Sequence, residues 1–151
     1  MKIKAHIDED IKRAMLAGEK TLVTTLRGLK SAILYEEVAK GARDQGLGED
    51  AVIDLLSKEA KKRQESADMY AQGGSIERSE AEAREKKIIE KYLPTQLTHE
   101  ELDKIVTEVI FEEKATGMSD MGKVIASVKV RSRGSADGAA ISKIVKEKLS
   151  S

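Results

Sequence analysis

The chain contains no cysteine and only one proline, Pro94. The absence of cysteine excludes disulfides, thiolate metal sites and cysteine nucleophiles. The near-absence of proline leaves long stretches free to form helices. Aromatic residues make up only 3% of the sequence, so a core must be built from Leu, Ile, Val, Ala and Met.

Long apolar runs are also missing, and none approaches the length of a membrane span. The N-terminus mixes charges with periodic apolar residues, which is unlike a secretory signal. We therefore expect a soluble, cytoplasmic protein with no membrane partner. Lys and Arg together number 27 and so do Asp and Glu, so overall charge gives no reason to expect a nucleic-acid partner.

Apolar residues recur at offsets of three and four through most of the chain, which predicts an all-α protein. In the first part we expect four helices, over residues 3–17, 20–40, 49–72 and 76–93, with Gly18 and Gly73–Gly74 as stops. Only the C-terminal half of the fourth is expected to dock, because its middle is nearly all charged or small. The residues expected to face inward include Met15, Leu34, Val38 and Tyr70.

Pro94 breaks the helical pattern, and a clear start signal follows it. Thr98 and Glu101 have the spacing of a capping box, and Leu97 can pack on Leu102 as a hydrophobic staple. Three helices are expected beyond this point: one to about Lys114 stopped by Gly117, one capped by Ser119 or Asp120, and one capped by Asp137. The predicted organisation is an N-terminal helical domain, residues 1–94, and a C-terminal three-helix domain, residues 95–151.

No set of residues in the sequence has the spacing of a catalytic or metal site. The glycines of the 41–48 segment lack the spacing of a phosphate-binding loop. His6 and His99 have no companion at ligand spacing, and Glu100, Glu101 and Asp103 are explained by the favourable field at a helix N-terminus. We therefore predict no catalytic residue, no metal and no cofactor.

Charge is unevenly distributed in the second part. Residues 98–120 hold seven acids and two bases, a balance of −5, whereas residues 121–146 hold six bases and one acid, a balance of +5. Lysines and arginines beside glycines and a helix N-terminus are typical of a phosphate-binding surface. The candidate nucleic-acid-binding residues are Lys123, Lys129, Arg131, Arg133, Gly134, Gly138 and Lys143. The alternative is an ordinary solvent-exposed surface, as we expect for a second basic run at residues 58–63.

Several segments resemble the YqeY family. They are Tyr92-Leu93-Pro94-Thr95-Gln96-Leu97, Met121-Gly122-Lys123-Val124-Ile125, Gly134-Ser135-Ala136-Asp137-Gly138, and the second-helix segment that begins at Leu26-Arg27-Gly28. The resemblance covers nearly the whole chain and implies a helical N-terminal part followed by a three-helix C-terminal part. Ser135 departs from the family pattern, which usually places a longer polar or basic side chain there.

The C-terminal part is similar to the tail of GatB, a subunit of the glutamine-dependent aminoacyl-tRNA amidotransferase, which contacts the tRNA body. The resemblance thus implies a non-catalytic accessory protein that binds tRNA, with an aminoacyl-tRNA synthetase or an amidotransferase as a further partner. One alternative is a helical protein-interaction adaptor. Another is a carbon–nitrogen ligase with glutamine as amide donor, an activity often attached to this family although no amidase motif is present here.

Overall fold

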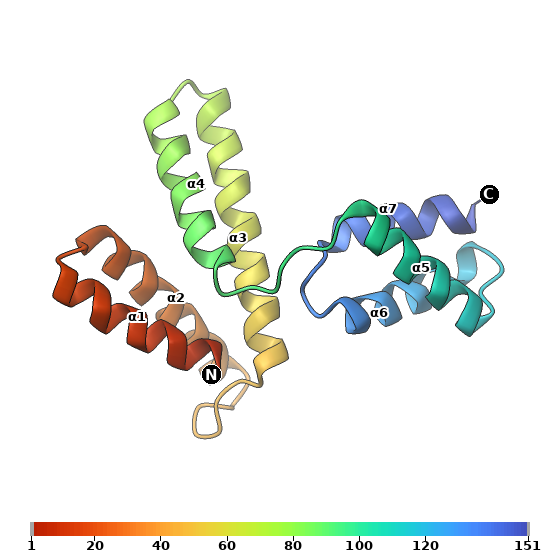
Figure 1. The fold of residues 1–151 in the computed structure, drawn as a ribbon, viewed down its shortest axis with the longest axis horizontal. Helices are drawn as coiled ribbons and strands as arrows, with labels where there is room; N and C mark the ends of the chain where they lie inside the picture. The colour runs from red at the N-terminus through yellow and green to blue at the C-terminus, as the bar shows by residue number, and fades with distance from the viewer. Residues whose placement is uncertain (1, 151) are drawn as a thin grey trace. The chain divides into compact units, whose positions relative to one another are not determined.

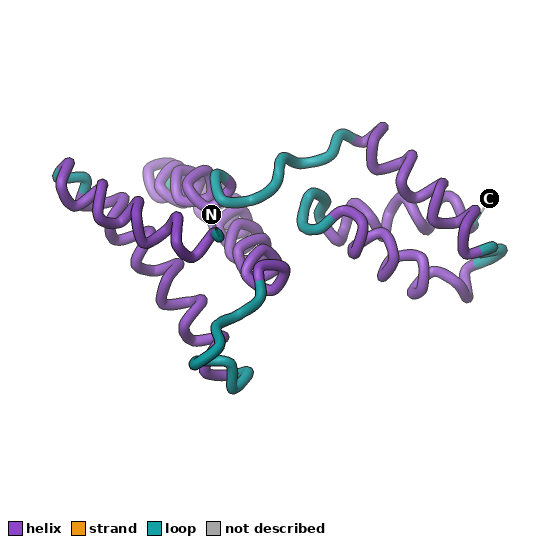
Figure 2. The backbone as a smooth tube through the Cα atoms, turned by 60° about the horizontal axis from the view of Figure 1, so that its bottom comes forward, coloured by secondary structure: helices purple, strands orange, loops and turns teal. Residues whose placement is uncertain are grey.

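The computed structural model describes residues 2–150, and every regular element in that range is helical. The prediction of an all-α protein is therefore confirmed. The chain divides into two compact units, residues 1–93 and residues 94–151. Figure 1 shows the helices of each unit, and Figure 2 shows the loops that join them.

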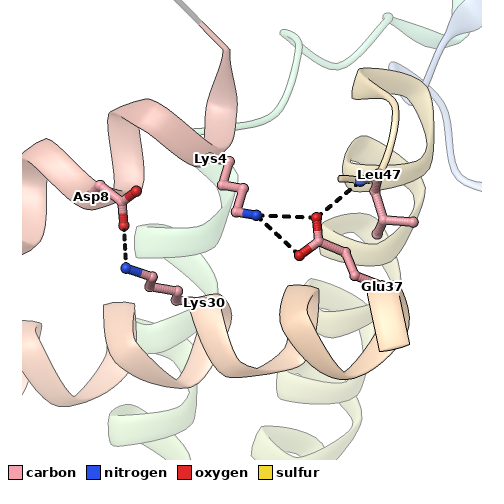
Figure 3. Close-up of polar contacts among 5 residues, drawn as sticks. All are labelled: Lys4, Asp8, Lys30, Glu37 and Leu47. Carbon is pink, nitrogen blue, oxygen red and sulfur yellow. Dashed lines mark hydrogen bonds and ion pairs between the residues drawn. The ribbon is translucent and has the colours of Figure 1, made fainter. Parts of the chain in front are cut away.

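The first unit begins with a hairpin of α1, Ile3–Ala17, and α2, Lys20–Ala39. Gly18 adopts the left-handed conformation, with φ of 73°, and its N–H and that of Glu19 bond the last carbonyls of α1. This geometry ends a helix and favours glycine because no Cβ is present to clash. The Lys30 ammonium lies 2.7 Å from the Asp8 carboxylate and links the two helices (Figure 3).

The second hairpin consists of α3, Glu49–Gln72, and α4, Ile76–Glu90. The two helices pack closely because the facing residues of α3, Ala60 and Ala67, are small and buried. The Ser79 hydroxyl of α4 donates to the Ala67 carbonyl at 2.7 Å, and Arg63 of α3 lies 2.8 Å from the Glu85 carboxylate. The polar first half of α4 therefore docks too, through a serine and ion pairs rather than through apolar packing.

The two hairpins share one apolar core in which α1, α2, α3 and α4 all take part. Its buried members are Ile7, Ile11, Leu26, Leu29, Ile33, Val52, Leu56, Ala60 and Ile89. Just beyond α4, the Tyr92 hydroxyl donates to Asp10 at 2.6 Å, and burial and this carboxylate raise the pKa of Tyr92. Residues from both ends of the unit are thereby held together.

Four residues expected to face inward are instead exposed or half-exposed: Met15, Leu34, Val38 and Tyr70. Periodicity identifies the apolar side of a helix but not how much of that side its neighbours cover. Neighbouring helices bury one side of α2 and leave Leu34 and Val38 in solvent. Tyr70 lies near the tip of the second hairpin, where the Arg78 guanidinium stands 5.9 Å from its ring centre.

The second unit consists of α5, His99–Glu113, the short 3-10 turn η1, Met118–Asp120, α6, Met121–Ser132, and α7, Gly138–Leu149. The predicted capping box is present, with the Thr98 hydroxyl and the Glu101 carboxylate each accepting the other residue's backbone N–H. The three helices enclose a core of aliphatic residues: Leu102, Val106, Val109, Val124, Val128, Ile141, Ile144, Val145 and Leu149.

The predicted end of α5, at about Lys114, is confirmed to within one residue: the helix ends at Glu113, and Lys114 takes the left-handed conformation, with φ of 55°. The predicted end of α4 is wrong by three residues, because α4 ends at Glu90 rather than at Leu93. The Asp120 carboxylate accepts the N–H of Thr116 at 3.0 Å and does not cap α6 through its side chain.

Candidate nucleic-acid interface

The basic residues predicted to bind nucleic acid separate into two groups on α6. Successive residues of an α-helix are rotated by about 100°, so Lys123 and Lys129 fall on one side of α6 within about 120° of arc, and Arg133 follows directly after the end of the helix. All three are exposed. Gly122, Ala126 and Val130, which is 72% exposed, share this side, and an added Cβ at Gly122 would meet nothing within 4 Å. We call these six residues the α6 basic face.

Arg131 does not belong to the α6 basic face, because it points toward α5. Its guanidinium lies 3.6 Å from the Glu108 carboxylate and also pairs with Glu112. Lys148 of α7 likewise lies 3.1 Å from Asp103 of α5. Ion pairs between α5 and the helices α6 and α7 thus neutralise part of the acidic segment and part of the basic segment. The lysines and the arginine of the α6 basic face take no part in these ion pairs.

Replacing Arg131 with glutamine tests the structural role of these ion pairs. We expect the free energy of unfolding of the second unit to fall by less than about 1 kcal/mol, because all three side chains are at least partly exposed to water. Urea unfolding followed by circular dichroism measures the loss. A double-mutant cycle with Glu112→Gln should give a coupling energy of a few tenths of a kcal/mol. Strictly additive effects of the two changes would contradict the pairing.

The loop after α6 is held in an unusual backbone conformation. Arg133 and Gly134 are both left-handed, with φ of 43° and 80°. The Gln96 side-chain amide donates to the Gly134 carbonyl at 3.2 Å, and the Leu97 N–H donates to the Ser135 carbonyl at 2.8 Å. The segment that precedes α5 therefore fixes the loop that carries Arg133.

The loop leads directly into α7, whose first residue, Gly138, lies beneath Lys129. A Cβ on Gly138 would stand 3.7 Å from Lys129 Cε and 3.8 Å from its Nζ. Asp137 occupies the N-cap position as predicted, but its side chain makes no cap hydrogen bond. A lysine ammonium near a helix N-terminus without a side-chain cap is an environment that favours an anion.

Lys143 lies on the exposed side of α7, away from the core residues Ile141, Ile144 and Val145. It is five residues from Gly138, a rise of about 7.5 Å along the helix. The structure thus brings together Lys129 and Gly138, places Arg133 and Gly134 in the adjoining loop, and leaves Lys143 further along α7.

Sequence inspection missed two contributions to this surface. Ala126 lies between the lysines of the α6 basic face, and the period of the exposed residues of α6 would have identified it. Gln96 and Leu97 hold the loop across 38 residues of sequence, and no local pattern indicates such a contact.

Residues 2–150 contain no group of three or more His, Asp or Glu side chains placed to hold a metal ion. None of the helices they form combines the length and hydrophobicity that a membrane crossing requires.

Fold and surface together define a small helical protein of two units, the second of which carries a basic helix face. The chain belongs to the YqeY family: the family described as Yqey-like protein matches residues 4–149. The resemblance drawn from the sequence motifs is thereby confirmed.

Relatives of this chain include three fungal proteins named Altered inheritance of mitochondria protein 41, mitochondrial. The protein of Eremothecium gossypii is 33% identical over 127 residues, which cover 82% of this chain and 68% of that protein. The proteins of Kluyveromyces lactis and Lachancea thermotolerans are 32% and 33% identical, and the matches cover 73% and 76% of this chain. The matches span only 60% and 62% of the length of these last two relatives.

These relatives correct one expectation. Each carries a mitochondrial designation in its name, which contradicts the prediction of a cytoplasmic protein. That prediction rested on an N-terminus unlike a secretory signal and on the absence of a membrane span. Neither feature distinguishes the cytoplasm from other aqueous compartments.

Proposed function

We propose that this protein is a non-catalytic accessory protein that binds tRNA through the α6 basic face and the N-terminus of α7. The observation that carries the proposal is the placement of Lys123 and Lys129 on one exposed side of α6, with the exposed Arg133 directly after the helix and Lys129 over Gly138. The similarity of the second unit to the GatB tail supports tRNA as the ligand.

The chemistry of the face suits a phosphate backbone rather than exposed bases. Lysine and arginine supply charge, and Gly122 and Ala126 are small enough for a backbone to approach the helix closely. The α6 basic face contains no aromatic residue on which a base could stack, which favours a folded RNA recognised by shape and phosphates. The proposal assigns no reaction to the protein and includes an aminoacyl-tRNA synthetase or an amidotransferase as a further partner.

A pair of substitutions tests the proposal without straining the backbone. Lys129→Gln with Arg133→Asn removes two charges, and asparagine tolerates the left-handed conformation that residue 133 adopts. We expect tRNA affinity to fall on the order of 30-fold at about 0.1 M salt, and the slope of log K against log salt to shrink by about 2. Filter binding at several salt concentrations measures both quantities.

The second unit offers a matched control pair, Lys104→Gln with Lys114→Asn. These changes also remove two charges, and Lys114 is likewise a left-handed helix-ending residue, but both positions belong to the acidic segment of α5. We expect this pair to change affinity by less than about threefold. Equal losses of tRNA affinity from the two pairs would show that only the net charge of the protein matters, and not the α6 basic face. Absence of tRNA binding by the unmodified protein would refute the proposal.

A further inference from the structure

Helix α2 is apolar on two sides, and the first unit covers only one of them. Leu26, Leu29 and Ile33 are buried in the core. On another side, Leu34, Tyr35 and Val38 are 46%, 78% and 56% exposed. Three large apolar residues within five positions of one helix form an exposed apolar patch, and such patches often mark interaction surfaces.

Small residues continue this exposed side toward the start of α2. The residues on this side follow one another at intervals of four, three, four and three residues, which is the spacing of the residues along a coiled-coil seam. Its members, from the small to the large end, are Thr24, Gly28, Ser31, Tyr35 and Val38. All five are exposed, so this seam, which we call the α2 seam, is available to another helix.

Gly28 has no role within its own unit that requires glycine. It lies in the interior of a helix of 20 residues, where glycine is among the poorest helix formers. A Cβ placed on it would meet nothing within 4 Å, and its φ is not left-handed. A glycine at such a position leaves a flat spot that a second helix can approach closely.

We propose that the α2 seam is a homodimer interface, occupied by α2 of a second copy running antiparallel about a two-fold axis beside Ser31. In this arrangement Tyr35 of each copy packs on Gly28 of the other, and Val38 packs on Thr24. A parallel pair would instead place tyrosine on tyrosine and leave glycine facing glycine. Only the antiparallel pair fits the large end of the seam to the small end.

The seam from residue 24 to residue 38 is about 21 Å long, so the interface is small and we expect a weak dimer. This inference is independent of the proposed tRNA binding.

Cysteine crosslinking tests the orientation, because the chain has no cysteine of its own. Ser31→Cys places two thiols beside the proposed two-fold axis, within reach of a disulfide. Thr24→Cys is the matched control, since antiparallel copies hold these two thiols about 21 Å apart. Under mild oxidation we expect a disulfide dimer from Ser31→Cys and little from Thr24→Cys. Equal crosslinking at the two positions would overturn the proposal.

Gly28→Gln tests the interface without weakening the monomer. Glutamine forms helix better than glycine and meets open space here, so we expect the Tm measured at a dilution where the protein is monomeric to rise by about 3 °C. The long side chain holds the copies apart, so the dimer Kd from sedimentation equilibrium should rise at least about tenfold. Ala5→Gln, at an exposed position of α1, should leave the Kd unchanged. A monomeric unmodified protein up to about 0.5 mM would overturn the proposal.

Discussion

Ile89→Ala is expected to lower the free energy of unfolding of the first unit by about 3 kcal/mol and to leave the second unit unaffected. Ile89 is 0% exposed and is the one buried residue of α4. With the partly buried Ile88 beside it, it joins α4 to the core that α1, α2 and α3 share, whereas the earlier part of α4 docks on α3 through a serine and ion pairs. Truncation therefore removes the apolar anchor of the helix and leaves a cavity where four helices meet.

Tyrosine fluorescence can follow this unit alone. The chain has three tyrosines, Tyr35, Tyr70 and Tyr92, all before residue 94, and no tryptophan. We expect urea unfolding of Ile89→Ala to shift the tyrosine transition to lower urea by about 1–2 M, while circular dichroism shows a second transition at the original position.

Ile141→Ala is the matched control in the second unit, since Ile141 is also 0% exposed and loses the same atoms. It should shift the transition seen by circular dichroism and leave the tyrosine transition in place. If both variants moved the tyrosine transition equally, the two units would unfold as one, and the description of two separate cores would fail.

Glu37→Gln is expected to destabilise the first unit by about 2.5 kcal/mol at neutral pH. Glu37 is only 1% exposed, an unusual position for a carboxylate. The Lys4 ammonium of α1 lies 3.0 and 3.1 Å from its two oxygens, and the Leu47 N–H donates to it at 2.9 Å (Figure 3). One side chain thus links α1, the end of α2 and the loop that leads to α3. Glutamine removes the negative charge that pairs with Lys4 and puts an NH2 group, which cannot accept a hydrogen bond, in place of one carboxylate oxygen.

The stabilisation by Glu37 should depend on pH in a defined direction. The hydrogen bonds from Lys4 and Leu47 lower the pKa of Glu37 below its ordinary value of 4.5. A group whose pKa is lower in the folded state stabilises that state fully above its unfolded pKa. The difference in unfolding free energy between the unmodified protein and Glu37→Gln should therefore be constant near neutral pH and shrink below about pH 4.5.

The neighbouring Glu36 provides the control for Glu37. Its carboxylate lies 3.2 Å from the ammonium of Lys40, the residue that follows α2. The Lys40 side chain is exposed and the Glu36 side chain is half-buried. Glu36→Gln should cost no more than about 0.5 kcal/mol. Chemical unfolding of the two variants at pH 7 and pH 4 measures both effects. Similar losses from both variants would show that burial of Glu37 has no special role.

The sequence predicted the helices well because their ends carry local signals. Gly18 and the Thr98–Glu101 capping box act within one turn of the backbone, so neighbouring residues suffice to locate them. The end of α4 was misplaced at Leu93 because Tyr92 and Leu93, which follow the helix, continue its apolar pattern and pack against the core. Side-chain burial was predicted less well, since Leu34 and Val38 share the apolar periodicity of α2 with residues that its neighbours bury.

The sequence by itself determined the helical class, the family and the segment that holds the basic residues, because periodicity, capping residues and motifs are properties of neighbouring positions. The tertiary structure alone decided which bases stay exposed. Arg131 and Lys129 are two residues apart and carry the same charge, yet only Arg131 faces the acids of α5. Lys129 instead lies over Gly138, a contact made when the loop at residues 133–137 turns α7 back toward α6. Such pairings depend on helix rotation and on contacts across many residues, which no local sequence pattern specifies.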